Sequence, residues 1–208
     1  MWYFNSMPSR NVIKFDTPET FYHVYARGAS KETIFRNTED YKFFIKLFSR
    51  YLSKEPQESR LGPYPHLRGK VELLSFCLMN NHFHMLIYQN DKSYMAALMK
   101  CVMTSYSRYF NTKYGRTGPV FETRYKAAKI DDPSYFTHIS RYIHLNPRYY
   151  KNYAYSSYRS IVDNDHEDWL QPERIMEEFN SVSEFKEFTQ DYENRRNDLT
   201  DIKSYIAG

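Results

Sequence analysis

Two histidines, His82 and His84, stand two residues apart in an apolar run over residues 78–87. Side chains alternate between the faces of a β-strand, so both imidazoles would point one way while Phe83 and Met85 point into the core. Two neutral imidazoles on one face can hold a single divalent metal ion. The same spacing is also typical of two half-buried histidines bonded to their neighbours, so the rest of the chain must decide between these interpretations.

A second group of candidate residues lies on a helix predicted over residues 134–146. Pro147 ends this helix because a proline disfavours helical geometry at the residue before it. His138, Tyr142 and Asn146 are spaced by four and would therefore be neighbours on one face. Apolar residues occupy a different, core-facing side of the helix. A tyrosine and an asparagine are thus offered together from one helix surface.

The elements that must position these residues follow from hydrophobic periodicity and from turn signals. We expect strands over 21–28, 70–78, 81–88 and 119–130, and helices over 38–52, 93–114 and 134–146. The order βαββαβ predicts an α+β fold, a ferredoxin-like antiparallel four-stranded sheet with helices on one face. Residues 53–69 contain three prolines and two glycines and are expected to form a long surface loop. Short helices over 172–179 and 182–192 predict a C-terminal helical extension.

Composition sets limits on the class of protein. The chain has 208 residues, a net charge of +4 and 21 tyrosines, which is compatible with a polyanionic partner without requiring one. Two cysteines, Cys77 and Cys101, make no disulfide framework and are expected to be buried thiols in a reducing compartment. No apolar run approaches the length of a membrane span, so we expect a cytoplasmic protein with no membrane partner.

Five segments, taken in order, resemble a known family. They are Phe-Tyr-His-Val-Tyr-Ala-Arg-Gly at 21–28, Leu-Met-Asn-Asn-His-Phe-His at 78–84, Gly-Pro-Val-Phe before Arg-Tyr-Lys at 118–126, Arg-Tyr-Ile-His-Leu-Asn-Pro at 141–147, and Tyr-Ser-Ser-Tyr at 155–158. In this combination the chain resembles the single-tyrosine HUH transposases, nearest to the REP-associated tyrosine transposases and their relatives. The resemblance implies a transposase/nuclease domain over 20–160, between an N-terminal lead-in, 1–19, and a C-terminal extension, 161–208.

The resemblance implies a metal-dependent endonuclease and strand transferase that acts on single-stranded DNA and recognises a DNA hairpin. His82 and His84 would hold the divalent ion, Mg²⁺ or Mn²⁺. Tyr142 would be the nucleophile that attacks a phosphate and stays joined to the 5′ end. Asn146 stands where relatives place a polar third ligand. These roles agree with the chemistry, since a free tyrosine has a pKa near 10 and needs a metal or a base to become a useful nucleophile.

Several further residues are candidates for contact with DNA. Arg124 and Lys126 would share one face of the fourth strand and contact phosphates, unless they form a solvated edge, and Arg27 could do the same. His138, one turn before Tyr142, is either a base, a phosphate contact or a partly exposed helix histidine. The loop over 53–69 and the C-terminal extension could take part in recognising the hairpin.

The sequence is also compatible with two other functions. One is a catalytically silent nucleic-acid-binding protein of the same fold, although the presence of both histidines, Tyr142 and Asn146 favours activity. The other is a metal-dependent phosphodiesterase that uses water, in which Tyr142 only packs. Relatives include both monomers and homodimers, and the segment before the tyrosine helix does not decide between these two states.

Overall fold

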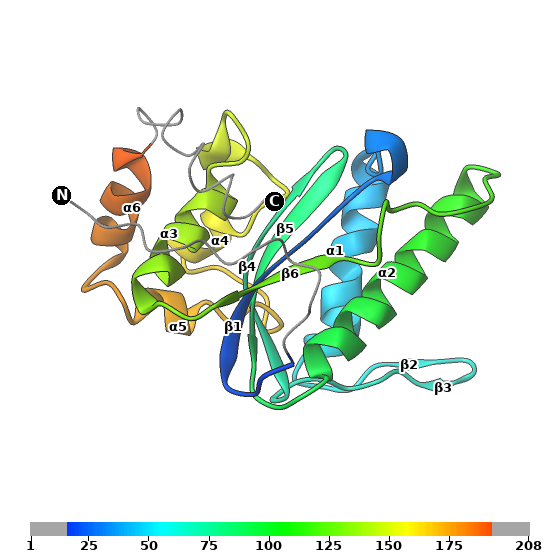
Figure 1. The fold of residues 1–208 in the computed structure, drawn as a ribbon, viewed down its shortest axis with the longest axis horizontal. Helices are drawn as coiled ribbons and strands as arrows, with labels where there is room; N and C mark the ends of the chain where they lie inside the picture. The colour runs from blue at the N-terminus through cyan, green and yellow to red at the C-terminus, as the bar shows by residue number, and fades with distance from the viewer. Residues whose placement is uncertain (1–15, 193–208) are drawn as a thin grey trace.

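The computed structural model describes residues 16–192, and its centre is a four-stranded sheet with the strand order β4-β5-β1-β6 (Figure 1). The strands are β1 (Thr20–Arg27), β4 (Val71–Met79), β5 (His82–Gln89) and β6 (Lys126–Ile130). All neighbouring strands are antiparallel. In the register of β1 and β5, Arg27 lies opposite His82 and Tyr25 lies opposite His84. The sheet therefore brings the end of the first strand beside the histidine pair.

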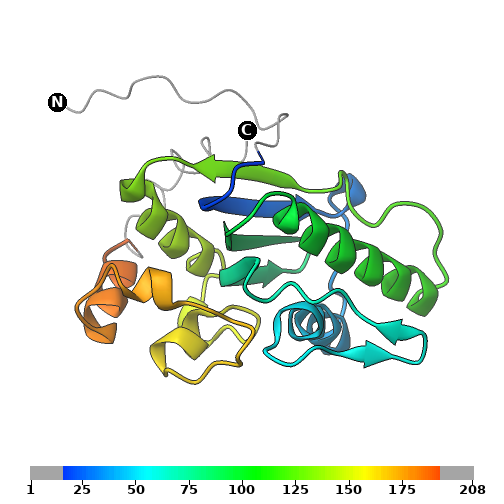
Figure 2. The same ribbon diagram turned by 90° about the horizontal axis from the view of Figure 1, so that it is seen from below.

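Helices cover both faces of this sheet (Figures 1 and 2). They are α1 (Thr38–Leu52) and α2 (Tyr94–Lys113) on one face and α3 (Pro133–His144) on the other. Strand alternation explains the division, because Phe83 contacts Phe44 of α1 while the next residue, His84, contacts Tyr142 of α3. The predicted ferredoxin-like βαββαβ unit, with both of its helices on one face, is confirmed. Helix α3 follows that unit and forms a third layer.

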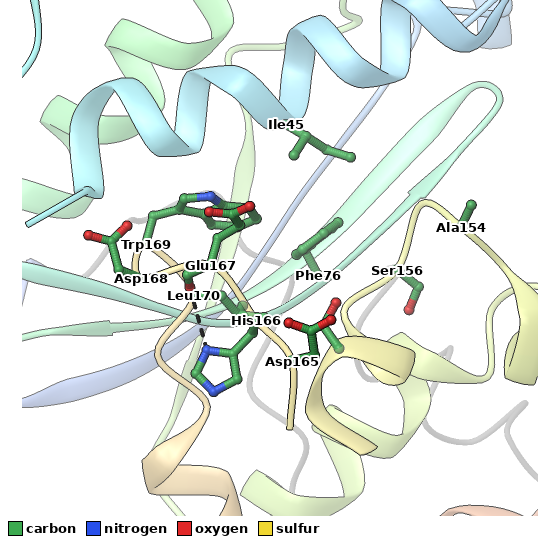
Figure 3. A pocket seen from close by; sticks show the side chains of 11 residues that line it. Ile45, Phe76, Ala154, Ser156, Asp165, His166, Glu167, Asp168, Trp169 and Leu170 are labelled. Carbon is green, nitrogen blue, oxygen red and sulfur yellow. Dashed lines mark hydrogen bonds between the residues drawn. The ribbon is translucent and has the colours of Figure 1, made fainter. Parts of the chain in front are cut away.

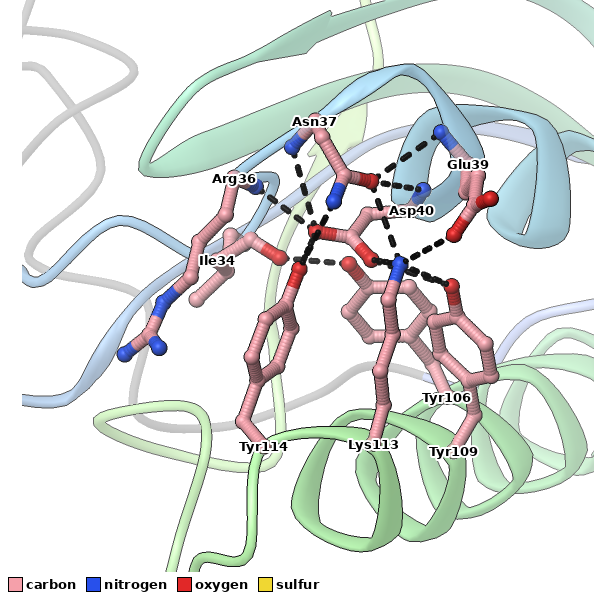
Figure 4. A network of polar contacts seen from close by, with 9 residues as sticks. All are labelled: Ile34, Arg36, Asn37, Glu39, Asp40, Tyr106, Tyr109, Lys113 and Tyr114. Carbon is pink, nitrogen blue, oxygen red and sulfur yellow. Dashed lines mark hydrogen bonds and ion pairs between the residues drawn. The ribbon is translucent and has the colours of Figure 1, made fainter.

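A buried polar network around Asp40 joins the start of α1 to the end of α2 (Figure 4). Asn37 and Asp40 form a capping box at the first turn of α1, which satisfies backbone N–H groups there. Asp40 also accepts hydrogen bonds from Lys113 Nζ at 2.7 Å and from Tyr114 Oη at 2.7 Å. These charge-assisted bonds fix the two helices against each other.

The fourth strand is shorter than the sequence predicts. The prediction of a strand over 119–130 is wrong for its first seven residues, because β6 begins only at Lys126. Gly118 has a φ of +86°, and Pro119 has no N–H with which to join a ladder. The chain instead runs past the end of β1, where the Glu122 amide donates to the Arg27 carbonyl at 2.9 Å. This irregular segment becomes one wall of the candidate site.

The predicted loop over residues 53–69 contains a short hairpin. Its strands are β2 (Glu58–Ser59) and β3 (Gly62–Pro63), and it projects on the side of α1 and α2 (Figure 1). Gly62 has a φ of +120°, a conformation that a side chain would disfavour. Leu61 at the tip is 99% exposed. The hairpin thus presents an apolar side chain to solvent.

The C-terminal part is helical, as predicted. The remaining helices are η1 (Ala29–Lys31), η2 (Tyr150–Asn152), α4 (Tyr158–Val162), α5 (Glu173–Met176) and α6 (Val182–Asp191). Helix α6 packs against α3, where Arg141 donates to the Phe188 carbonyl at 3.0 Å, and α5 packs against both α3 and β4. The predicted helix over 172–179 is reduced to α5.

Residues 1–15 and 193–208, which include most of the lead-in and the end of the extension, lie outside the described residues, and the domain boundaries stay a prediction.

The two cysteines are free thiols. Cys77 is buried, as expected, while Cys101 is only half-buried. Among residues 16–192, no helix combines the length and the apolar character that a membrane crossing requires.

Candidate active site

The two histidines and the tyrosine helix meet at a cavity of about 400 Å³. The His82 and His84 side chains come from β5, and their ring centroids lie 5.1 Å apart. Tyr142 and Asn146 reach the same cavity from α3 and from the residues just after it. The other lining residues are Tyr25, Ala26, Arg27, Glu122, Thr123 and Lys126. The structure therefore brings the four central predicted residues together.

Hydrogen bonds hold one nitrogen of each histidine. His82 Nδ1 lies 2.7 Å from Asn81 Oδ1, an acceptor, so Nδ1 carries the proton and Nε2 keeps its lone pair. His84 Nδ1 lies 2.9 Å from Nε2 of the fully buried His23. When His84 donates its Nδ1 proton to His23, its Nε2 lone pair is also available to a ligand. A partner on the opposite ring nitrogen is how proteins orient metal-binding histidines.

Burial keeps this histidine cluster neutral. Desolvation lowers the pKa of His23 to about 3 and that of His82 to about 4, with the nearby Arg27 charge adding to the effect on His82. Desolvation also holds the pKa of His84 well below its usual range. A metal ligand must be unprotonated, and these imidazoles already are at neutral pH. The donor chemistry therefore fits a divalent cation.

Asn146 presents its amide oxygen to the site. Its Nδ2 donates to the Tyr142 carbonyl at 2.9 Å and to the Ile143 carbonyl at 3.4 Å, which satisfies two orphan carbonyls at the end of α3. With the nitrogen so used, Oδ1 is left for the cavity. The Asn146 side chain also interacts with His82, where it raises the pKa against the effect of burial. Among the described residues, no cluster of three or more His, Cys, Asp or Glu could hold a metal, so an amide oxygen would have to complete the set.

Tyr142 is a nearly buried, protonated phenol. Its ring lies edge-on to His84 at 5.4 Å and to His23 at 6.1 Å. Desolvation raises the pKa of Tyr142 to about 12, although Arg27 and a hydrogen bond with Asn146 act in the opposite direction. A phenol with this pKa is almost entirely un-ionised at neutral pH, so it requires activation before it can attack.

The predicted cationic residues separate into two groups. Arg27 and Lys126 line the cavity, whereas Arg124 is exposed and lies before the start of β6, outside the lining set. Arg124 and Lys126 therefore do not share a strand face. The reason is the late start of β6 after the irregular segment that follows Gly118.

His138 does not line the cavity, despite its four-residue spacing from Tyr142. Its ring contacts Phe188 of α6 and Tyr192, and Nδ1 bonds with Arg141. Helix α3 packs against the sheet on one side and against α6 on another, so residues four apart on it can contact different elements. The geometry leaves His138 outside the cavity.

Sequence reasoning missed four lining or supporting residues: His23, Tyr25, Glu122 and Thr123. A signal existed for the first two, because they share with Arg27 the strand face that receives the histidine pair. No pattern pointed to Glu122 or Thr123, which reach the cavity because the chain is irregular there.

A hollow of about 510 Å³ elsewhere has a different character (Figure 3). Asp165, Glu167 and Asp168 gather at it, beside the buried rings of Phe76 and Trp169. Carboxylates repel a phosphate, so this surface does not suit a nucleic-acid backbone.

Comparison with known proteins then assigns the central segment. Residues 66–146 match the family model described as "Transposase IS200 like". This segment is therefore similar to that transposase family. It contains both cavity histidines, Tyr142 and Asn146, and the resemblance predicted from the sequence is confirmed.

The fold also resembles that of a solved structure. A solved structure of a REP-associated tyrosine transposase bound to a REP hairpin matches with a TM-score of 0.52 and 11% identity, over 78% of this chain and 92% of that one. At this identity the likeness concerns the fold. No curated protein matches this chain.

Proposed function

We propose that this chain cuts and rejoins single-stranded DNA with Tyr142 as the nucleophile. The observation that carries the proposal is the convergence of Tyr142 and Asn146 with the histidine pair in one cavity that two cationic side chains also line. A silent DNA-binding protein would have no need for a phenol in contact with two neutral imidazoles. The match of residues 66–146 to the transposase family model supports DNA processing as the general activity.

The chemistry is a transesterification. The Tyr142 oxygen attacks the phosphorus, the bond from phosphorus to the 3′ oxygen breaks, and the phenol proton leaves while the 3′ oxygen gains one. The products are a tyrosine joined to the 5′ phosphate and a free 3′ hydroxyl. Since one phosphoester replaces another, the cut strand can be rejoined by the reverse reaction. Attack by water would lose this ability.

His82, His84 and the Asn146 amide oxygen are the residues that would hold a divalent cation, Mg²⁺ or Mn²⁺. When bound, such an ion supplies positive charge that stabilises the charge developing on the phosphate. His84 is oriented by His23, and Asn146 is oriented by the end of α3. The chain's own part is thus to place three neutral donors and one phenol around a single phosphate.

Arg27 and Lys126 would neutralise the DNA backbone at the cavity. The solved relative is bound to a REP hairpin, and we take a DNA hairpin next to the cut as the substrate here as well. Arg124 and His138 are not assigned a catalytic part, since neither lines the cavity.

The test is a denaturing gel with labelled single-stranded DNA that carries a hairpin from the native locus, incubated with Mg²⁺ or Mn²⁺. The wild type should give a covalent adduct that depends on metal, and Tyr142→Phe should give none. Tyr135→Phe makes the same change on the same helix outside the cavity and should keep the adduct. Cleavage by Tyr142→Phe would indicate water as the nucleophile, and binding without cleavage by the wild type would indicate the silent function.

A further inference from the structure

A second surface of the molecule combines cations with aromatic rings. It is a groove of about 800 Å³ that residues of α1, α2 and the β2–β3 hairpin line. These elements lie on the opposite side of the sheet from α3 (Figure 2). Arg50, Arg60 and Arg108 line it. None of the described residues that line it is acidic, and these three arginines form no ion pair with a carboxylate of residues 16–192. Their charges are therefore available to an anionic partner.

Aromatic rings lie among these charges. Phe43 and Tyr109 stack in parallel with centroids 3.9 Å apart, and Tyr64 lies 4.4 Å below the Arg50 guanidinium. All three rings are partly exposed. Leu61, at the tip of the hairpin, adds an apolar side chain at the rim that is 99% exposed.

We infer that this groove binds a segment of single-stranded DNA outside the cleavage site. A single strand offers both phosphates for the arginines and base faces for the rings, which is the combination that proteins use for unpaired nucleic acid. A duplex hides its base faces and would use only the cations. The inference rests on the proposed function in taking DNA as the partner.

The groove is connected to the catalytic end of the sheet. Lys113 lines the groove and also bonds to Asp40 at 2.7 Å. The chain just before α1 is in turn fixed to the β4–β5 turn, because the Ile34 amide donates to the Asn80 carbonyl at 2.8 Å. Asn80 stands two residues before His82. These bonds fix the position of the groove relative to the turn that precedes the histidine strand.

The test is binding of a fluorescein-labelled oligothymidylate of thirty nucleotides, followed by anisotropy at several salt concentrations. The double variant Arg60→Ser/Arg108→Ser should bind about tenfold more weakly and lower the slope of log K against log salt by about 1.4, since each lost phosphate contact contributes about 0.7 on a single strand. Lys92→Ser/Lys186→Ser removes the same charge from exposed residues outside the groove and should change affinity less than about threefold.

Tyr64→Ala separates stacking from charge. It should weaken binding about tenfold, the size of one base–aromatic contact, with an unchanged salt slope. Equal losses in the arginine and lysine double variants would overturn the inference, and so would a blunt duplex that competes as well as the single strand. This experiment measures binding and not cleavage, so it can refute the groove without refuting cleavage by Tyr142. If the groove variants still form the Tyr142 adduct and bind oligothymidylate as tightly as the wild type, only the groove proposal is refuted.

Discussion

Two buried polar clusters in this molecule differ in how completely their hydrogen-bonding atoms are paired. Around Asp40 every acceptor is used: Lys113 and Tyr109 donate to Oδ1, while Tyr114 and the Arg36 amide donate to Oδ2 (Figure 4). Within residues 16–192, only one ring nitrogen of His84 has a hydrogen-bond partner, and the cavity lies beside the ring. A closed set of bonds stabilises the fold, whereas lone pairs left toward a cavity are suited to a ligand.

The two clusters also differ in charge. Desolvation works against the Asp40 carboxylate, but bonds from Lys113, Tyr114 and other donors outweigh it and hold the pKa of Asp40 below its usual value. At the histidines nothing opposes burial strongly enough, and the pKa values fall. One cluster is thus a compensated ion pair and the other a neutral donor set. This comparison can be tested by changing each cluster separately.

The largest effect on stability is expected from Asp40→Ala. It should lower the free energy of unfolding by about 3 kcal/mol, because Lys113 and several donors lose a buried acceptor. Urea unfolding measures this, and Mn²⁺ affinity should not change. Glu39→Ala is the matched control, since Glu39 pairs with the same Lys113 but is exposed, and it should cost less than about 0.5 kcal/mol. Similar losses in both variants would contradict the closed network.

An intermediate effect is expected at the other cluster from His23→Phe. Removing the partner of His84 Nδ1 should weaken Mn²⁺ binding about 10- to 100-fold, the usual result of losing a group that orients a metal ligand. Titration calorimetry measures it. His144→Gln changes another buried histidine, which bonds to Ser157 and lies outside the cavity, and should leave Mn²⁺ affinity within about twofold. Unchanged binding in His23→Phe would show that His84 needs no orientation.

The smallest effect is a pH dependence of stability. Desolvation lowers the pKa of His144 to about 3 in the folded chain, while an unfolded histidine titrates near 6.5. Above pH 6.5 neither state binds the proton, and below it only the unfolded state does, so the free energy of unfolding falls as pH falls. Each such histidine should remove about 1 kcal/mol between pH 6 and pH 5.

Urea unfolding at both pH values measures this dependence. His144→Gln should reduce the difference between pH 6 and pH 5 by that amount, whatever its effect at neutral pH. An identical difference in wild type and variant would mean that His144 is not kept neutral by burial.

Much of the fold could be predicted because it depends on local patterns. The bounds of the helix over 38–52 were predicted correctly from acids in the first turn and an apolar stripe, although the residue that caps it is Asn37 and not Thr38. The fourth strand was predicted too long, because β-rich composition over 119–125 does not reveal that a glycine with positive φ and a proline keep the chain out of the ladder. The hairpin within 53–69 was missed because its strands have only two residues each.

The candidate site divides in the same way. His82, His84, Tyr142 and Asn146 were identified from spacing and family resemblance, and all four line the cavity. His138 met the same spacing rule as Tyr142, yet its ring turns to α6. A periodicity assigns a residue to a helix face but does not say which layer covers that face.

By itself, then, the sequence determined the quantities that depend on neighbours along the chain: the alternation that puts two histidines on one face, the helical step from Tyr142 to Asn146, and the order of the elements. Only the tertiary structure decided that His23 holds His84, from 61 residues away, and that Arg27 and Lys126 face the cavity while Arg124 does not. Strand register, the choice of sheet face for α3 and the path of an irregular segment arise from contacts between distant residues. Those contacts exist only when the whole core has packed.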